Sequence, residues 1–325
     1  MKLPRRAFLH LAVGAAALPS MSRIGKAQTY PTRAVRIVVG FPAGGGSDIQ
    51  ARFMGQWLSE RLGQPFVVEN RPGAATNIAT EVVVRAPPDG YTLLHFGSAG
   101  AINATLYDKL NFNLIRDIVP VASMLRVTNI MEVHPSVPTN TLPEFIAYAK
   151  ANPGTINMAS SGIGSVQHVS GELFKMMTGV NMVHVPYRGA GPALTDLLSG
   201  QVQVMVDSMS SSLEHIRAGK LRALAVTTAA RSEALRDIPT VGEFVPGYET
   251  STSSGLGAPR NTPTEIVDKL NKEINAGLAD PRLRARIAEL GATVFVGSPG
   301  DFGKHITAET EKWAKVIRAA NIKAE

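Results

Sequence analysis

The stretch AVRIVVGFPAGGGSD, Ala34–Asp48, joins a run rich in β-branched residues to a glycine-rich loop. Ala34–Gly40 predicts a buried β-strand, and the apolar residues after the loop recur at helical spacing as far as Gly63. The next predicted elements are a strand, a helix and a strand, over Phe66–Glu69, Asn77–Arg85 and Tyr91–Phe96. The order βαβαβ is typical of a parallel sheet with helices on its faces.

The same order recurs later in the chain. Ile156–Ala159 predicts a strand, Ser160–Ser165 is a second glycine-rich loop, SSGIGS, and Val166–Met177 predicts a helix. A strand, a helix and a strand follow, over Met182–Val185, Pro192–Leu198 and Val202–Asp207. The chain of 325 residues is long enough for two domains. We therefore predict an α/β protein of two similar α/β domains with mixed, mainly parallel sheets.

The last part of the chain is expected to return to the first domain. Three apolar stripes at helical spacing follow Pro263, with a short strand at Thr293–Val296 among them. Two crossings between domains predict a hinge, near Val127–Val133 and near Thr250–Gly257, although the second range also suits a surface loop. We predict domain 1 over residues 28–128 plus 252–325 and domain 2 over residues 129–251.

The first 27 residues have the pattern of a secretory signal peptide. The basic pair Arg5-Arg6 precedes an apolar run that ends at Leu18, and small residues stand at Gly25 and Ala27. The arginine pair resembles that of twin-arginine export signals of bacteria. The apolar run is shorter than the roughly 20 residues of a membrane span. We expect cleavage near Ala27 and a soluble protein in the periplasm.

The charge of the whole chain, +7, would suggest a nucleic acid or an anionic membrane as partner. Five Lys and Arg and no acidic residue lie within residues 1–27, which leaves 28 Lys and Arg against 26 Asp and Glu. A mature net charge of +2 argues against nucleic acid. The chain has no cysteine, which excludes disulfides, Fe–S clusters, Cys-ligated zinc and a thiol nucleophile.

Both glycine-rich loops connect a strand to the start of a helix, where ligands bind in open α/β sheets. Free N–H groups and the positive end of the helix dipole suit an anion there. Neither loop has a complete nucleotide-binding motif, and His168 and His184 have no carboxylate at metal spacing, so no cofactor or metal is predicted. The loops are expected to face each other across a cleft, with tight structural turns as the alternative. The candidate binding residues are Phe41, Ala43, Gly44, Gly45, Gly46, Ser47 and Asp48 in the first loop, and Ser160, Ser161, Gly162, Gly164 and Ser165 in the second.

Some candidates allow a second interpretation. Asp48 stands just inside its helix and is most simply an N-terminal cap. His168 is either a ligand contact or a structural residue of its helix, and Arg188 is either a ligand contact or a solvated turn residue. Ser165, His168 and Asp207 would also permit a periplasmic serine hydrolase. A serine and a histidine three residues apart on a helix rarely have the geometry for that reaction, which favours a binding protein.

Several segments resemble the Bug-type receptors of tripartite tricarboxylate transporters, which are periplasmic solute-binding proteins. These segments are FPAGGGSD at 41–48, ENRPGA at 69–74, DGYTL at 89–93, GIGS at 162–165 with His168 and GEL at 171–173, and VPYRGAGPALTDLL at 185–198. The resemblance runs from about Tyr30 to the C-terminus. This chain departs from it at Ala74-Ala75-Thr76, where the family usually has more glycine.

The resemblance implies a hinged fold like that of type II periplasmic binding proteins, which closes over a small organic carboxylate. It implies a receptor rather than an enzyme, which delivers its ligand to the membrane permease subunits of a tripartite transporter. Both loops would hold the ligand with backbone N–H groups, hydroxyls and ordered waters, and Asn77 and Asp207 would flank it. A receptor for a sensor kinase is the remaining alternative. We expect a monomer, and the ligand itself is not predicted.

Overall fold

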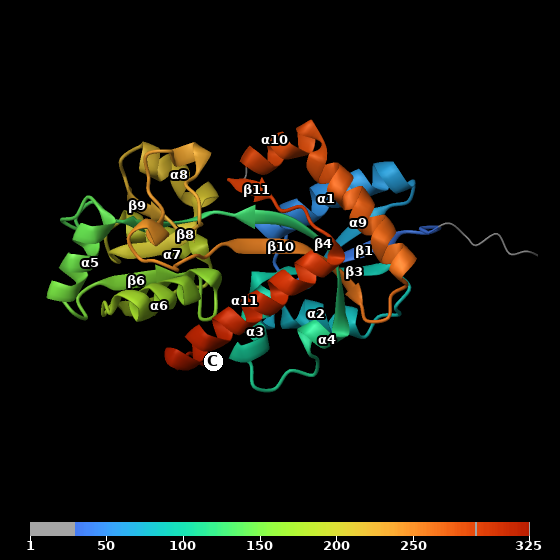
Figure 1. Ribbon diagram of the computed structural model, residues 1–325, viewed down its shortest axis with the longest axis horizontal. Helices are drawn as coiled ribbons and strands as arrows, with labels where there is room; N and C mark the ends of the chain where they lie inside the picture. The colour runs from blue at the N-terminus through green and yellow to red at the C-terminus, as the bar shows by residue number, and fades with distance from the viewer. Residues whose placement is uncertain (1–29, 290, 325) are drawn as a thin grey trace, which may run out of the picture.

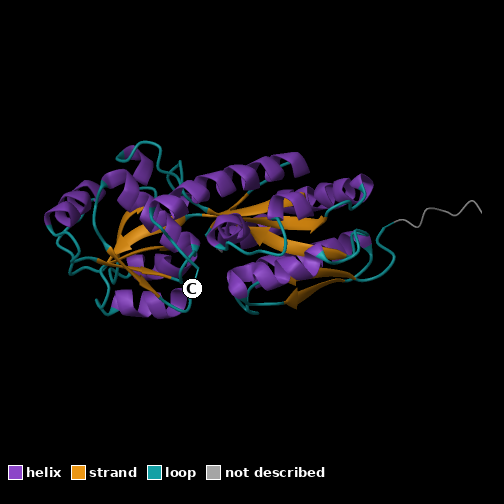
Figure 2. Ribbon diagram, turned by 90° about the horizontal axis from the view of Figure 1, so that it is seen from below, coloured by secondary structure: helices purple, strands orange, loops and turns teal. Residues whose placement is uncertain are grey.

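The computed structural model describes residues 30–289 and 291–324, which form two lobes, each built on its own β-sheet (Figure 1). The predicted export signal lies outside the described residues. Helices cover both faces of the strands in each lobe (Figure 2). Within the described part of the chain, no helix combines the length and the apolar run required to cross a bilayer.

The first lobe contains a six-stranded sheet in the order β11-β4-β10-β3-β1-β2. Its strands are β1 (Val35–Val39), β2 (Phe66–Asn70), β3 (Thr92–Gly97), β4 (Ile118–Val127), β10 (Thr252–Pro259) and β11 (Ala292–Val294). Its helices are α1 (Gly46–Leu62), the short η1 (Ala74–Thr76), α2 (Asn77–Val84), α3 (Ser98–Leu106), α4 (Leu114–Asp117), α9 (Thr264–Ala279), α10 (Pro281–Glu289) and α11 (Pro299–Ala319). β1 pairs in parallel with β2 and β3, whereas β10 is antiparallel to β3 and β4.

The second lobe contains a five-stranded sheet in the order β7-β6-β8-β5-β9. Its strands are β5 (Asn129–Val133), β6 (Asn157–Ser160), β7 (Val183–Pro186), β8 (Val204–Ser208) and β9 (Arg222–Val226). Its helices are α5 (Leu142–Ala151), α6 (Val166–Thr178), α7 (Ala190–Leu198), α8 (Met209–Arg217), η2 (Glu233–Leu235) and η3 (Val241–Glu243). β6 pairs in parallel with β7 and β8, whereas β5 is antiparallel to β8 and β9.

The two sheets share one plan. The order β2-β1-β3-β10-β4 in the first lobe matches β7-β6-β8-β5-β9 in the second. In both, the fourth strand is antiparallel to its two neighbours and begins directly after a crossing between the lobes. The predicted α/β fold of two similar domains with mixed sheets is therefore confirmed. The expectation that the sheets are mainly parallel is wrong, because four of the nine strand pairings in the described residues are parallel and five are antiparallel.

The chain crosses between the lobes at two neighbouring places. β4 is separated from β5 by Thr128 alone, and the return passes through Thr250 and Ser251 into β10. Thr227 links the two crossings, because its Oγ1–H lies between the backbone oxygens of Thr250, at 2.8 Å, and of Asn129, at 3.2 Å, and can donate to either. Any hinge is therefore confined to these short connections.

The Thr, Ser and Gly-rich stretch Thr250–Gly257 is not the flexible loop that its composition suggests. Most of it belongs to β10, a buried strand in the middle of the first sheet. A Cβ atom on Gly255 would lie 2.3 Å from the backbone oxygen of Ala122 and 2.6 Å from the ring of Phe302. Close packing, rather than flexibility, explains the small residues here.

The last helix packs on both lobes, which corrects the expectation that the C-terminal segment returns to the first domain alone. Phe302 and Ile306, in the first half of α11, lie in an apolar cluster of the first lobe. Trp313 and Ile317, in the second half, belong to a cluster that includes Phe174 of α6 and the core of the second lobe. Figure 1 shows α11 running across the front of the molecule toward the second lobe.

Candidate functional site

A cavity of about 360 Å³ lies between the lobes, where β1, β3 and β6 end. This volume falls within the range of small-molecule sites in proteins, roughly 300–1,000 Å³. The first lobe contributes Phe41, Ser47, Gln50, Ala75, Thr76, His95–Gly100, Asn103, Val127 and Thr252–Ser254, and the second contributes Ser161–Gln167. Both lobes therefore form its wall.

The residues that line this cavity include no lysine, arginine, aspartate or glutamate. Its polar groups are hydroxyls, amides, one imidazole and the backbone, and the rest of the wall is apolar. An anionic ligand would have no cationic side chain to pair with in this wall. Stabilisation of a negative charge would have to come from oriented N–H groups and hydroxyls.

The amino ends of four helices reach the cavity. α1, α2 and α3 start after Gly45, Thr76 and Gly97, and no side chain caps them. α6 starts after Ser165, whose Oγ accepts one hydrogen bond, from the backbone N–H of His168 at 3.2 Å. Uncapped N–H groups and the positive ends of helix dipoles favour an anion. The cavity can thus bind a carboxylate without a cationic side chain.

Buried side chains support the second loop, Ser160–Ser165, from behind. Ser160 Oγ lies 2.7 Å from His184 Nε2, and the His184 ring stacks on that of His168 with centroids 3.6 Å apart. His168 Nδ1 accepts from the backbone N–H of Gly164 at 3.1 Å. Burial lowers the pKa of His168 to about 3 and that of His184 to about 4, so both rings are neutral at neutral pH. These histidines position the loop and do not line the cavity.

Ser165, His168 and Asp207 do not form a catalytic triad. The ring nitrogen Nδ1 of His168 is occupied by Gly164, and Ser165 Oγ accepts from the backbone of His168. Asp207 is fully buried, and its Oδ2 accepts from Ser211 Oγ at 2.6 Å. A hydrolase needs a base that contacts the nucleophile, and this arrangement has none.

The first loop, residues 41–46, is exposed, and Asp48 holds it to the body of the lobe. Asp48 Oδ2 accepts from the backbone N–H of Gly44 and from Arg52 Nε, both at 2.9 Å, and Oδ1 accepts from Asn70 Nδ2 at 3.0 Å. The hydrogen bond from Arg52 lowers the pKa of Asp48 to about 2, with help from Gly44 and Asn70. Asp48 therefore anchors the loop, and it is not the cap of its own helix.

All of the predicted site residues except Arg188 fall into three groups. Six line the cavity: Phe41, Ser47, Ser161, Gly162, Gly164 and Ser165. The exposed loop beside it contains Ala43, Gly44, Gly45 and Gly46, and the buried support behind it contains Asp48, Asn77, Ser160, His168 and Asp207. Arg188 lies apart, in a neighbouring pocket of about 340 Å³ with Tyr107 and Tyr187.

The segment His95–Asn103 forms a large part of the wall but contains none of the predicted site residues. Gly97-Ser98-Ala99-Gly100 connects β3 to α3, just as the two predicted loops follow β1 and β6. The same criterion, small residues between a strand and a helix, would have found it. The wall residues Thr252–Ser254 of β10 were missed because their composition suggests a hinge.

The turn Ala74–Thr76 has a backbone conformation that favours glycine. Ala74, Ala75 and Thr76 have φ angles of 44°, 50° and 82°, a left-handed conformation that glycine adopts without strain. Ala75 and Thr76 line the cavity. In this chain, side chains therefore stand in the wall where the resemblance suggests glycine.

Comparison with known proteins identifies the family. Residues 50–322 match the family described as "Tripartite tricarboxylate transporter family receptor". The solved structure of R. palustris Rpa4515 with adipate is 40% identical, covers 90% of this chain and 99% of its own, and has a TM-score of 0.81. The periplasmic binding protein BugD is 34% identical over 91% of this chain and 100% of its own, with a TM-score of 0.78.

A third solved structure is MatC (Rpa3494) from Rhodopseudomonas palustris with bound malate. It is 32% identical, covers 89% of this chain and 100% of its own, and has a TM-score of 0.77. BugD is a periplasmic binding protein, and the other two structures contain a small carboxylate. This chain belongs to the receptor family of tripartite tricarboxylate transporters, whose members are solute-binding proteins.

Proposed function

We propose that this protein is a periplasmic receptor that binds a small organic carboxylate between its lobes and delivers it to the permease subunits of a tripartite transporter. One observation carries the proposal: four helix amino ends, three of them uncapped, meet at a cavity with no charged side chain in its wall. The bound adipate and malate of two structural neighbours are small carboxylates, which supports it.

The ligand would bridge the two lobes. We infer that its carboxylate contacts the start of α3 at Ser98–Gly100 and the second loop at Ser161–Ser165, with Ser47 of α1 beside it. Closure would occur at the crossings, Thr128 and Thr250–Ser251, between the two lobes, with the second half of α11 remaining packed on the second lobe. Only contacts that exist in the closed form can favour closure.

The cellular context is part of the same proposal. Residues 1–27 would direct export and be removed near Ala27, and the mature receptor would act as a monomer. Deletion of the gene should abolish uptake of the ligand, and expression of the mature chain in the periplasm should restore it. Uptake that is unchanged in the deletion strain would contradict the role in transport.

Thermal unfolding of the mature protein tests the ligand class. The protein is heated with mono-, di- and tricarboxylates and, as matched controls, with the neutral amide of each acid. A carboxylate that binds should raise the melting temperature, and its amide should not, because the helix ends attract the negative charge. The proposal fails if no carboxylate raises the melting temperature, or if the amides do so equally.

A further inference from the structure

The pocket that contains Arg188, called the adjacent pocket below, shares part of its wall with the cavity. Its volume is about 340 Å³, and Gly162 and Ile163 of the second loop line both spaces. Leu106 and Tyr107, at the end of α3, supply the wall that comes from the first lobe. A ligand long enough to pass Gly162 and Ile163 would therefore occupy both spaces and contact both lobes in each.

Arg188 gives the adjacent pocket a positive charge. None of the other described residues that line this pocket is charged. In the first lobe, Arg71 follows the corresponding strand β2, and its Nε donates to Glu69 of that strand at 2.6 Å. The strand before Arg188, Val183–Pro186, has no acidic residue. Among the ion pairs within residues 30–289 and 291–324, none involves Arg188.

Two backbone hydrogen bonds hold the turn that contains Arg188 against the second loop. The N–H of Tyr187 donates to the backbone oxygen of Ser160 at 3.0 Å, and the N–H of Gly189 donates to that of Ser161 at 3.2 Å. The side chain of Arg188, between these two bonds, is exposed. The loop that lines the cavity therefore also fixes the backbone from which this arginine extends.

The chemistry of the two spaces suits a ligand with two anionic ends. The helix amino ends at the cavity favour one carboxylate. An arginine can bind another through two parallel N–H···O bonds. Ile163 lines both spaces, and Leu106 and Pro186 line the adjacent pocket. An apolar linker between the two carboxylates would pass these side chains without burying an unpaired polar group.

We propose that the adjacent pocket is a second anion subsite, in which Arg188 binds the distal carboxylate of a linear dicarboxylate whose other end lies at the helix amino ends. This inference rests on the proposed function, because it assumes that the first carboxylate binds in the cavity. Arg188 is then a specificity-determining residue. A dicarboxylate too short to pass Ile163 gains nothing from it.

Calorimetric titration of the mature protein with a length series tests the inference. The ligands are succinate, glutarate, adipate, pimelate and suberate, each paired with its monoamide, which keeps the length and one carboxylate but removes the distal charge. The shortest diacid should bind no more tightly than its monoamide. From one length onward, the diacid should bind about threefold to tenfold more tightly, because it gains an exposed charge pair.

The outcomes separate the two proposals. An equal affinity of diacid and monoamide at every length, or an equal advantage of the diacid at every length, overturns the inference and leaves the proposed function standing. No binding by any carboxylate, including those of the thermal test, overturns both.

Substitutions assign the advantage of the long diacids to Arg188. Arg188→Gln should remove that advantage and leave the affinity for the monoamides unchanged. Arg188→Lys keeps the charge but not the two parallel hydrogen bonds, and should retain part of the advantage. Arg217→Gln makes the same charge change at an exposed arginine of α8 in the same lobe, and should leave the advantage intact. An advantage that survives in Arg188→Gln overturns the inference.

Salt provides a test on the unmodified protein. The screening length falls from about 10 Å at 0.1 M salt to about 3 Å at 1 M, so a contact with an exposed arginine weakens over that range. The advantage of the long diacid over its monoamide should therefore shrink as salt is added. An advantage that is the same at both concentrations indicates an apolar contact of the longer chain and overturns the inference.

Discussion

The two lobes share one strand order but contribute to the cavity in different ways. In the first lobe, α3 follows β3 and its amino end lines the cavity. In the second, the corresponding helix α8 follows β8, and the hydroxyls of its Ser211 and Ser212 donate to the buried carboxyl groups of Asp207 and Glu132. A repeated architecture therefore does not make equivalent positions equivalent in function.

The two glycine-rich loops also differ, in their exposure and in the side chains that hold them. Residues 41–46 are exposed and are held chiefly through Asp48, whereas Ser160 and Gly164 are buried and contact a stacked pair of histidines. We interpret the second loop as the preformed half of the site and the first loop as the adaptable half. The following predictions test that contrast, from the largest expected effect to the smallest.

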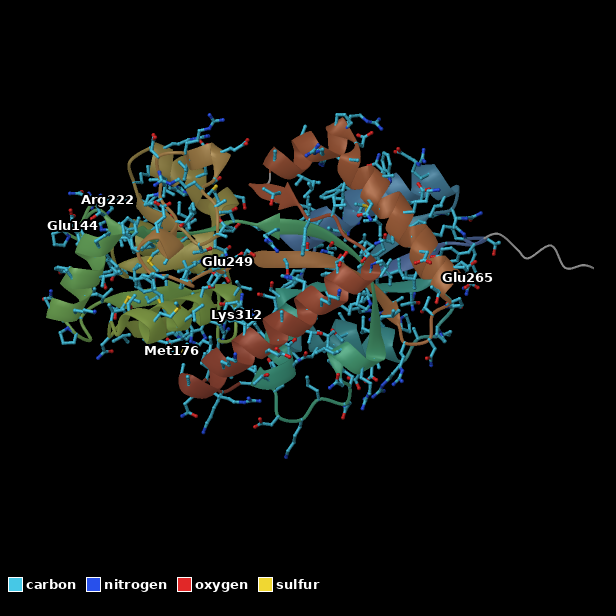
Figure 3. All side chains as sticks on the ribbon, in the orientation of Figure 1. Glu144, Met176, Arg222, Glu249, Glu265 and Lys312 are labelled. Atoms are coloured by element: carbon cyan, nitrogen blue, oxygen red, sulfur yellow. The ribbon has the colours of Figure 1, made fainter. Side chains whose placement is uncertain are left out.

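The largest effect is expected at Trp313, where α11 joins the lobes. Trp313 is fully buried, and its Nε1 donates to Glu309 Oε2 at 2.9 Å. The neighbouring Lys312 Nζ donates to the backbone oxygen of Glu249 at 3.5 Å. Figure 3 shows Lys312 and Glu249 at the junction of the lobes. Trp313→Ala should lower the free energy of unfolding by about 3–5 kcal/mol. In calorimetry the thermal transition should split in two, because the lobes lose a shared core.

Phe302→Ala is the matched control on the same helix. Phe302 is also fully buried, but it belongs to an apolar cluster of the first lobe alone. It should cost a similar free energy, about 3–5 kcal/mol, without splitting the transition. If both variants unfold in one transition, the end of α11 does not couple the lobes.

A smaller effect, of opposite sign in the two lobes, is expected from pH. Burial raises the pKa of Glu132 from 4.5 to about 8, with a small contribution from Asp207. Because the folded-state pKa is the higher one, the contribution of Glu132 to stability is fully present below about pH 4.5 and is lost as the pH rises through 8. Glu132→Gln removes this loss and should be more stable than the parent by about 2–3 kcal/mol at pH 9.

Asp48 in the first lobe provides the contrast. Its pKa is lowered from 3.8 to about 2, so its contribution is present above about pH 4 and is lost as the pH falls toward 2. Because Arg52 is largely exposed, that contribution should be only about 1 kcal/mol. Urea unfolding from pH 3 to pH 9 measures both effects. A parent protein whose stability does not fall above pH 5 would contradict the assignment to Glu132.

The sequence predicts most of the fold because its patterns are local. β-branched runs predict β1 and β8, and glycine-rich connections predict both loops. The composition of β10 does not predict a buried strand, because a glycine such as Gly255 is required there by the close approach of Phe302 and Ala122, which a local pattern does not reveal. Local patterns predict elements, and tertiary contacts determine which of them reach the ligand.

A pair of glycine substitutions, which should differ in stability by only about 1–2 kcal/mol, distinguishes the two loops directly. Gly44 and Gly164 have nearly the same left-handed backbone, with φ of 83° and 73°, so Gly→Ala adds about 1 kcal/mol of strain at each. No atom lies within 4 Å of a Cβ built on Gly44, whereas one on Gly164 would lie 2.1 Å from Leu106 Cδ2, a buried side chain of α3. Gly164→Ala should therefore cost about 2–3 kcal/mol in urea unfolding, and Gly44→Ala about 1 kcal/mol.

Gly179→Ala in the second lobe controls for position in the chain. Gly179 has a φ of 72° and no atom within 4 Å of its Cβ position, so this variant should behave like Gly44→Ala. Ligand affinity provides a second measurement. Gly164→Ala should lower the affinity for the ligand, because the displaced loop lines the cavity, whereas Gly179→Ala should leave it unchanged. An equal loss of stability in all three variants would mean that the Leu106 side chain moves aside at little energetic cost. The second loop would then be no more rigid than the first.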